Sequence, residues 1–174
     1  MPRRRKPSAG VIALPPEIIE AHQRQFPADF DAQGVQLLFA IRALARRINE
    51  RANTWLAPFG LTARDMNYLA SLDACGERDV TLNELGRLTH SSNAGVTQTT
   101  DSLERRGLVV RTPNRGDRRS TVVKLTPAGE DLFKDAFSVH NRNIRRITTA
   151  VDEDVKRSLL AAFALLGKSL DEEI

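Results

Sequence analysis

The chain has 174 residues, of which 41% are hydrophobic and 28% charged, and its formal net charge is +4. This length fits one domain, or one small domain with an extension, and no apolar run reaches the ~18–20 residues of a membrane-spanning helix. The single cysteine, Cys75, excludes an intrachain disulfide and a cysteine-based metal cage. The positive charge favours an anionic partner, and the low aromatic content of 5% argues against a base-stacking surface.

The first 32 residues predict a flexible basic arm, residues 1–16, and a short extension, residues 17–32. The arm combines arginines and lysine with prolines and small residues, so it is either a solvated terminus or an arm that touches phosphates. Prolines follow the basic residues where a secretory signal has an apolar stretch, which predicts a cytoplasmic protein. A short helix is expected from Pro16 to Gln25, ending at Phe26-Pro27.

Four helices are predicted between residues 33 and 106. The first, about Gln33 to Ala57, has apolar residues at spacings of three and four and ends at Pro58 and Gly60. The next two begin after the capping residues Thr62 and Thr81, each followed by an acidic residue three positions later. The fourth begins at Ser91 or Ser92 and ends at Gly107. Two short helices joined by a tight turn have the proportions of a helix-turn-helix.

A hairpin and two helices complete the prediction. Residues 108–111 and 121–125 are strands around a polar turn, and Thr126-Pro127 begins a helix that runs to about Val151. A last helix begins near Asp152. The expected fold is mainly α with a small β-hairpin wing: a winged helix-turn-helix over 61–129, with N- and C-terminal dimerisation helices over 33–60 and 130–174.

The fourth helix is a candidate reader of DNA bases. Val96, Thr99 or Thr100, and Leu103 form its inward face. The residues expected at its start and on its outward face are Ser91, Ser92, Asn93, Ala94, Thr97, Gln98 and Asp101. Amides of Asn and Gln can bind adenine through two hydrogen bonds, and the helix N-terminus presents free N–H groups to phosphate. The alternative is an ordinary solvated polar face.

The hairpin adds a positive cluster beside this helix. Six arginines and one acidic residue lie between Arg105 and Arg119. Arg115, Arg118 and Arg119 are expected at the hairpin tip, within reach of phosphates or a narrow minor groove. Asp117 would repel phosphate, so we expect it to hold a nearby arginine in place. Together the helix and the cluster predict double-stranded DNA as the partner.

The stretch 117–129 resembles the wing motif D-x-R-x-x-x-V-x-L-T-x-x-G of the multiple-antibiotic-resistance regulator (MarR) family. The matching residues are Asp117, Arg119, Val123, Leu125, Thr126 and Gly129. Upstream, residues 96–98 and 103–109 are similar to the family's recognition helix and its exit. The resemblance extends from about Gln33 to Leu170, nearly the whole chain outside the arm.

This resemblance implies a homodimer in which the first and last helices of the subunits interlock. The recognition helix of each subunit enters a major groove, and Arg119, oriented by Asp117, enters the flanking minor groove. Many members repress transcription until a small aromatic or phenolic effector, or an oxidant, loosens DNA binding. The residues support the dimer independently, because the C-terminal helices carry more apolar surface than one winged-helix unit covers.

The effector site is less clearly marked. Trp55, Phe59 and Met66 lie where the family's ligand crevice is expected, although plain core packing is the favoured role for each. Cys75 lies at the end of the second helix, away from the position of oxidant-sensing cysteines, so we expect an inert thiol. The three histidines are scattered without carboxylates or cysteine at ligand spacing, so we expect no metal and no cofactor.

Two other classes of protein are alternatives. An enzyme would need a nucleophile with a base, paired carboxylates or a phosphate-binding glycine loop, and the sequence has none of these patterns. A winged helix that binds only proteins would lack the arginine cluster. The sequence therefore predicts a non-enzymatic, ligand-responsive repressor that binds a pseudo-palindromic operator as a homodimer.

Overall fold

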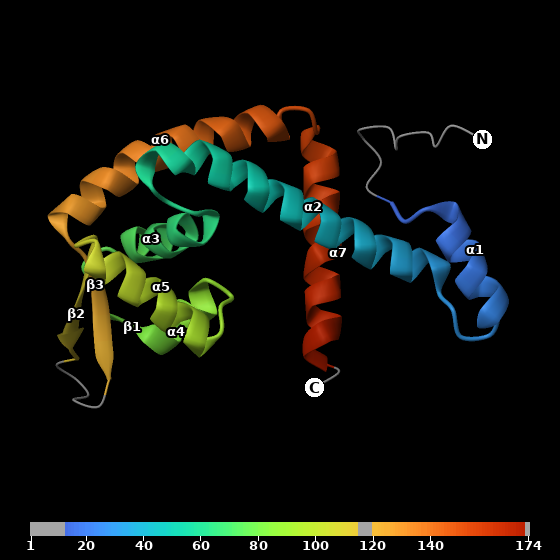
Figure 1. The fold of residues 1–174 in the computed structure, drawn as a ribbon, viewed down its shortest axis with the longest axis horizontal. Helices are drawn as coiled ribbons and strands as arrows, with labels where there is room; N and C mark the ends of the chain where they lie inside the picture. Colours follow the sequence, from blue (N-terminus) through green and yellow to red (C-terminus); the bar gives the residue numbers. More distant parts are fainter. Residues whose placement is uncertain (1–12, 115–119, 173–174) are drawn as a thin grey trace, which may run out of the picture.

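The computed structural model describes residues 13–114 and 120–172. In Figure 1, a block of short helices and a small sheet lies below two long helices, one of which continues far beyond the block, and a third long helix runs down the page. The elements in chain order are α1 (Pro16–Gln25), α2 (Ala32–Leu56), a 3-10 turn (Ala57–Phe59), α3 (Ala63–Cys75), β1 (Val80–Thr81), α4 (Leu82–Leu88), α5 (Asn93–Arg105), β2 (Val109–Pro113), β3 (Thr121–Leu125), α6 (Pro127–Thr148) and α7 (Glu153–Glu172).

Side-chain caps set the starts of the helices in the block. Thr62 and Asp65 form a capping box at α3, and the hydroxyl of Thr81 accepts from the third residue of α4. The sequence predicts either Ser91 or Ser92 as the cap of α5. In the structure Ser92 is the cap, and its Oγ accepts from the backbone N–H of Gly95 at 3.2 Å. These bonds satisfy N–H groups that have no partner within their own helix.

The wing is a three-stranded antiparallel sheet with strand order β1-β3-β2. The predicted hairpin is present, with Val109 opposite Leu125 and Pro113 opposite Thr121. The sequence missed β1, which pairs Val80 with Val123. A two-residue strand is too short to show an alternating pattern, so only its tertiary pairing reveals it.

One hydrophobic core holds the block together. It is formed by α3, α4, α5 and the sheet, with Leu56 from α2 and Phe133 from α6. At its centre the hydroxyl groups of Tyr68 and Thr100 are hydrogen-bonded at 2.5 Å. Burial raises the pKa of the Tyr68 phenol, so it stays neutral and keeps this bond.

The long helices leave much apolar surface exposed. α7 has no buried residue, and Leu160 in it is 69% exposed. The exposed large hydrophobic residues of α2, α6 and α7 are Val35, Leu37, Leu38, Phe39, Leu44, Ile48, Phe137, Ile144, Ile147, Val155, Leu159, Leu160, Phe163, Leu165 and Leu170. An apolar surface this extensive marks an interaction face on a protein that works in water. Along residues 13–114 and 120–172, no helix has the length and apolar content to cross a bilayer.

The winged-helix block is joined to α6 by a close backbone contact at Leu108. The N–H of Thr126 donates to the Leu108 carbonyl at 3.1 Å, and the Thr126 hydroxyl donates to the carbonyl of Gly107 at 2.6 Å. A Cβ on Gly129 would stand only 1.9 Å from the Leu108 carbonyl oxygen. The L-T-x-x-G pattern therefore has a packing reason: the threonine caps α6, and the glycine allows its first turn to lie against the chain.

We expect Gly129→Ala to lower the free energy of unfolding by about 3 kcal/mol, the upper end of the cost of overpacking, because the contacting atom is backbone and cannot rotate away. Ala128→Gly is the matched control in the same turn. Ala128 is exposed, so that change should cost no more than about 1 kcal/mol of helix propensity. Chemical denaturation at fixed protein concentration measures both, and equal losses would contradict the packing role of Gly129.

Candidate nucleic-acid interface

The helix-turn-helix places α5 on the surface of the block with one face free. The turn between α4 and α5 is tight: the N–H of Ser91 donates to the Gly86 carbonyl at 2.9 Å, and His90 adopts a positive φ of 49°. A Cβ on Gly86 would lie 3.2 Å from the Ser91 carbonyl oxygen, which is shorter than most Cβ contacts in proteins. The two helices therefore approach closely at this turn.

The two faces of α5 are oriented as the sequence predicts. The inward residues are all buried, including both threonines between which the prediction did not choose: Val96, Thr99, Thr100 and Leu103. The predicted outward residues are all exposed: Asn93, Ala94, Thr97, Gln98 and Asp101. The buried threonines satisfy their hydroxyl groups on carbonyl oxygens one turn earlier in the same helix, at 2.9 and 2.8 Å.

The outward side chains differ in whether they already make hydrogen bonds within the chain. The Thr97 hydroxyl donates to the Asn93 carbonyl at 2.9 Å, and the Ser91 hydroxyl donates to the Thr89 carbonyl at 3.2 Å. In the described part of the chain, no hydrogen bond engages the side-chain amides of Asn93 or Gln98. These two amides on the outward face of α5 are thus available to an external partner.

Asp101 has an internal partner that the sequence did not suggest. Its Oδ1 accepts from Nη2 of Arg111 on β2 at 2.6 Å, and Glu104 binds Nη1 of the same guanidinium. Burial lowers the pKa of Arg111, but its hydrogen bonds to Asp101 and Glu104 outweigh burial, so the pKa lies above its usual value. The pairing links residues ten positions apart on different elements, which no local sequence pattern reveals.

The predicted wing tip, Arg115, Asp117, Arg118 and Arg119, lies outside the described residues. The stem of the wing is described. The N–H of Asn114 donates to the Ser120 carbonyl at 3.1 Å, and their side chains are hydrogen-bonded at 2.8 Å. These bonds join the ends of β2 and β3 at Asn114 and Ser120.

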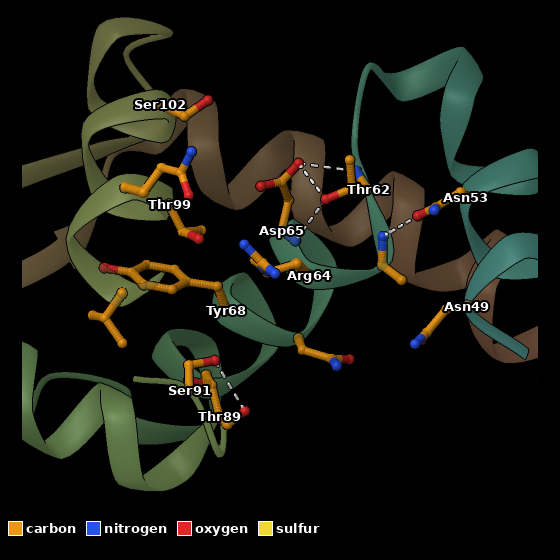
Figure 2. Close-up of a pocket in the computed structure, with 14 residues that line it drawn as sticks. Asn49, Asn53, Thr62, Arg64, Asp65, Tyr68, Thr89, Ser91, Thr99 and Ser102 are labelled. Atoms are coloured by element: carbon orange, nitrogen blue, oxygen red, sulfur yellow. Dashed lines mark hydrogen bonds between the residues drawn. The ribbon is translucent and has the colours of Figure 1, made fainter. Parts of the chain in front are cut away.

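A pocket of about 590 Å³ lies between α2, α3 and α5. Figure 2 shows side chains from the three helices around it, with Arg64, Asp65 and Tyr68 on α3 facing Thr99 and Ser102 on α5. Its lining residues are Asn49, Asn53, Thr62, Ala63, Arg64, Asp65, Asn67, Tyr68, Thr89, Ser91, Val96, Gln98, Thr99 and Ser102. Most of them carry amide or hydroxyl groups, and Gln98 belongs both to this pocket and to the outward face of α5.

The three predicted ligand residues do not line this pocket. Met66 is 1% exposed within the core, and Trp55 and Phe59 are partly buried against it. Core packing accounts for Met66 and Phe59, and their role in binding an effector stays a prediction. The sequence missed the polar pocket because its lining comes from three helices whose faces meet only in the folded chain.

Trp55 instead joins two long helices. Its Nε1–H donates to Nδ1 of His140 on α6 at 2.9 Å, and the two rings are 5.9 Å apart. Since Nδ1 accepts this bond, it carries no proton in the folded chain. Burial lowers the pKa of His140 below its ordinary value of 6.5, which favours the same neutral ring.

The fold and the free face of α5 define a winged helix-turn-helix protein. A sequence profile of the MarR family matches residues 59–120. Uncharacterized HTH-type transcriptional regulator YcgE of Bacillus subtilis is 30% identical over 112 residues, which are 64% of this chain and 70% of that protein. The chain belongs to the MarR family.

Further relatives match most of the chain. HTH-type transcriptional regulator PecS of Dickeya dadantii is 25% identical over 155 residues, 88% of this chain and 93% of that protein. Among solved structures, a DNA complex of MepR from S. aureus is similar with a TM-score of 0.72 and 19% identity, over 79% of this chain and 99% of that one. The transcriptional repressor CouR, bound to a 23-mer DNA duplex, is similar with a TM-score of 0.68 and 26% identity, over 80% of this chain and 99% of that one.

The Trp55–His140 bond predicts a pH-dependent loss of stability. The folded-state pKa of His140 lies below the unfolded one, so the stabilisation is fully present above about pH 6.5 and is lost as the pH falls through the folded pKa. His140→Gln is the matched control, because its amide oxygen can accept the same bond without titrating. Trp55 is the only tryptophan, so its fluorescence reports the bond directly during denaturation between pH 5 and 8. Parallel pH profiles for the two proteins would contradict the prediction.

Proposed function

We propose that this MarR-family protein is a transcription regulator that binds double-stranded DNA, with α5 as the helix that enters the major groove. The observation that carries the proposal is the exposed face of α5, on which the amides of Asn93 and Gln98 have no hydrogen bond within the described residues. Exposed amides in the first turns of a helix match the hydrogen-bonding edge of adenine. A winged helix that binds only proteins would not need such a face beside six arginines.

The regulator acts as a homodimer on a pseudo-palindromic operator. The exposed apolar faces of α2, α6 and α7 support this assembly, because a second copy of the chain is the partner that covers them symmetrically. The dimerisation helices are then those of 33–60 and 130–174, and the winged helix-turn-helix occupies 61–129. Two α5 helices related by a two-fold axis would contact half-sites about 34 Å apart.

The wing extends the contact to the backbone and the minor groove. In this proposal Arg119 enters the minor groove and Asp117 orients it, with Arg115 and Arg118 near phosphates. One support is the match of 117–129 to the family's wing motif. The other is the hydrogen bond between Asn114 and Ser120, which holds the ends of the two wing strands together. The positive net charge of the chain adds a sequence-independent attraction to DNA.

The regulator is a repressor released by a small effector, for which the pocket between α2, α3 and α5 is the proposed site. A ligand with an aromatic body and a phenolic or carboxylate group suits a lining that combines the Tyr68 ring with amides, hydroxyls and Arg64. Because Gln98 lines the pocket as well as the outward face of α5, a bound ligand would compete with DNA for it. The relatives named as repressors, such as transcriptional repressor MprA of Escherichia coli, support this sign of regulation.

We expect Gln98→Ala to weaken binding to the preferred operator by about 1–3 kcal/mol and to leave binding to random duplex DNA nearly unchanged, because the amide contacts bases rather than phosphates. The operator is first selected from random duplex DNA. Gln23→Ala, an exposed amide on α1 far from α5 (Figure 1), is the control. An equal loss on operator and random DNA would reassign Gln98 to phosphate contacts, and absence of any duplex binding by the unmodified chain would overturn the proposed function.

We expect Phe163→Asp to dissociate the dimer, because it places a charge in the exposed apolar stripe of α7. Ala161→Asp adds the same charge two residues earlier, on the opposite side of a helix that turns ~100° per residue, and should leave the dimer intact. Sedimentation at micromolar concentration distinguishes the two species. A dimeric Phe163→Asp protein would show that α7 lies outside the subunit interface.

A further inference from the structure

A cluster of one arginine and two carboxylates ties the outward side of α5 to the wing strand β2. Arg111 on β2 donates from Nη2 to Asp101 and from Nη1 to Glu104. The backbone N–H of Arg111 also donates to Oε1 of Glu104 at 3.0 Å. Glu104 therefore binds both the backbone and the side chain of Arg111, and the guanidinium is held in one place from which it reaches Asp101.

Asp101 is the member of this cluster that faces the proposed DNA. It lies three residues after Gln98 and four after Thr97, so it shares their side of α5. Its side chain is 54% exposed, whereas that of Arg111 is 23% exposed. A carboxylate at this position, left free, would approach the phosphate backbone together with the bases that Gln98 contacts, and like charges in such a contact are strongly unfavourable.

We propose that Arg111 is a positioning residue of the DNA interface: it holds Asp101 against β2, so that the carboxylate is kept partly neutralised and away from the phosphates. The planar guanidinium suits this role because its fork of N–H donors can bind two carboxylates at once, which a lysine ammonium does not do with fixed geometry. This inference rests on the proposed function and changes one part of it, since Asp101 then shapes the interface without reading a base.

Two other roles are possible for these side chains, and they predict different mutant behaviour. If Arg111 bound a phosphate directly, its loss would weaken binding whatever residue stood at position 101. If Asp101 read a base, for example by accepting from a cytosine amino group, its neutralisation would reduce the preference for the operator. The proposed role predicts instead that neutralising Asp101 reverses the effect of losing Arg111.

The test compares Arg111→Met, Asp101→Asn and the double variant in the full chain, on the selected operator and on random duplex DNA at one salt concentration. Arg111→Met should weaken binding to both by about tenfold or more, because the freed carboxylate repels every phosphate backbone alike. Asp101→Asn in the same chain should recover most of that loss. Asp101→Asn alone should leave the ratio of operator to random binding unchanged.

A double variant no stronger than Arg111→Met would overturn the proposal, and so would a lower operator preference in Asp101→Asn alone. Circular dichroism and thermal melting of each variant separate a loss of fold from a loss of binding. If Arg111→Met does not fold, Arg111→Lys replaces it, and the same rescue by Asp101→Asn is required. The proposed function fails separately, when the unmodified chain binds no duplex at all.

Discussion

The backbone contact between Leu108 and the first turn of α6 is the constraint on which the arrangement of this protein depends. Three segments meet there: the end of α5, the start of β2 and the start of α6. Gly107 ends α5 with a positive φ of 71°, and the Leu108 carbonyl then accepts from Thr126 and lies against Gly129. Because this contact involves backbone atoms and a glycine, it fixes the direction of α6 relative to α5 more firmly than side-chain packing would.

The direction of α6 connects the outward face of α5 with the proposed dimer interface. α6 packs onto the block through Phe133 and continues beyond it with an exposed apolar face, and α7 carries a further one. In a homodimer, the spacing of the two α5 helices would be set through this connection. The pocket between α2, α3 and α5 lies where α2 meets the winged-helix block. A ligand there that displaced α5 slightly relative to α2 would change the half-site spacing that the dimer can bind.

The polar interactions around α5 all serve to present a small number of free groups. Thr99 and Thr100 bond within their own helix, Thr100 also meets the buried Tyr68 hydroxyl, and Asp101 is held by Arg111. The threonine bonds satisfy hydroxyl groups inside the core, whereas the Arg111 pair binds a carboxylate on the outward face. Among the described residues, Asn93 and Gln98 are the polar side chains of the outward face that make no hydrogen bond. A few well-placed hydrogen-bonding groups are what specificity for a base sequence requires.

Local sequence signals were enough to predict the helices, the β-hairpin, their order and the two faces of α5, but not β1. Caps such as Thr62 and Thr126, the change from a helical to an alternating pattern after Gly107, and the spacing of Val96 and Leu103 are local signals, because each acts within one or two turns of chain. The wing motif over 117–129 likewise indicates the family from the sequence alone.

Only the tertiary structure decided which residues meet across elements. The Val80–Val123 pair, the Arg111 cluster, the Trp55–His140 bond and the polar pocket each join segments separated along the chain. Asp101 carries the same outward spacing as Gln98, yet its carboxylate is bound to Arg111 on β2, whereas the Gln98 amide makes no hydrogen bond within residues 13–114 and 120–172. The physical reason is that periodicity fixes the direction of a side chain from its own helix, whereas its partner depends on which other element the folded core brings beside it.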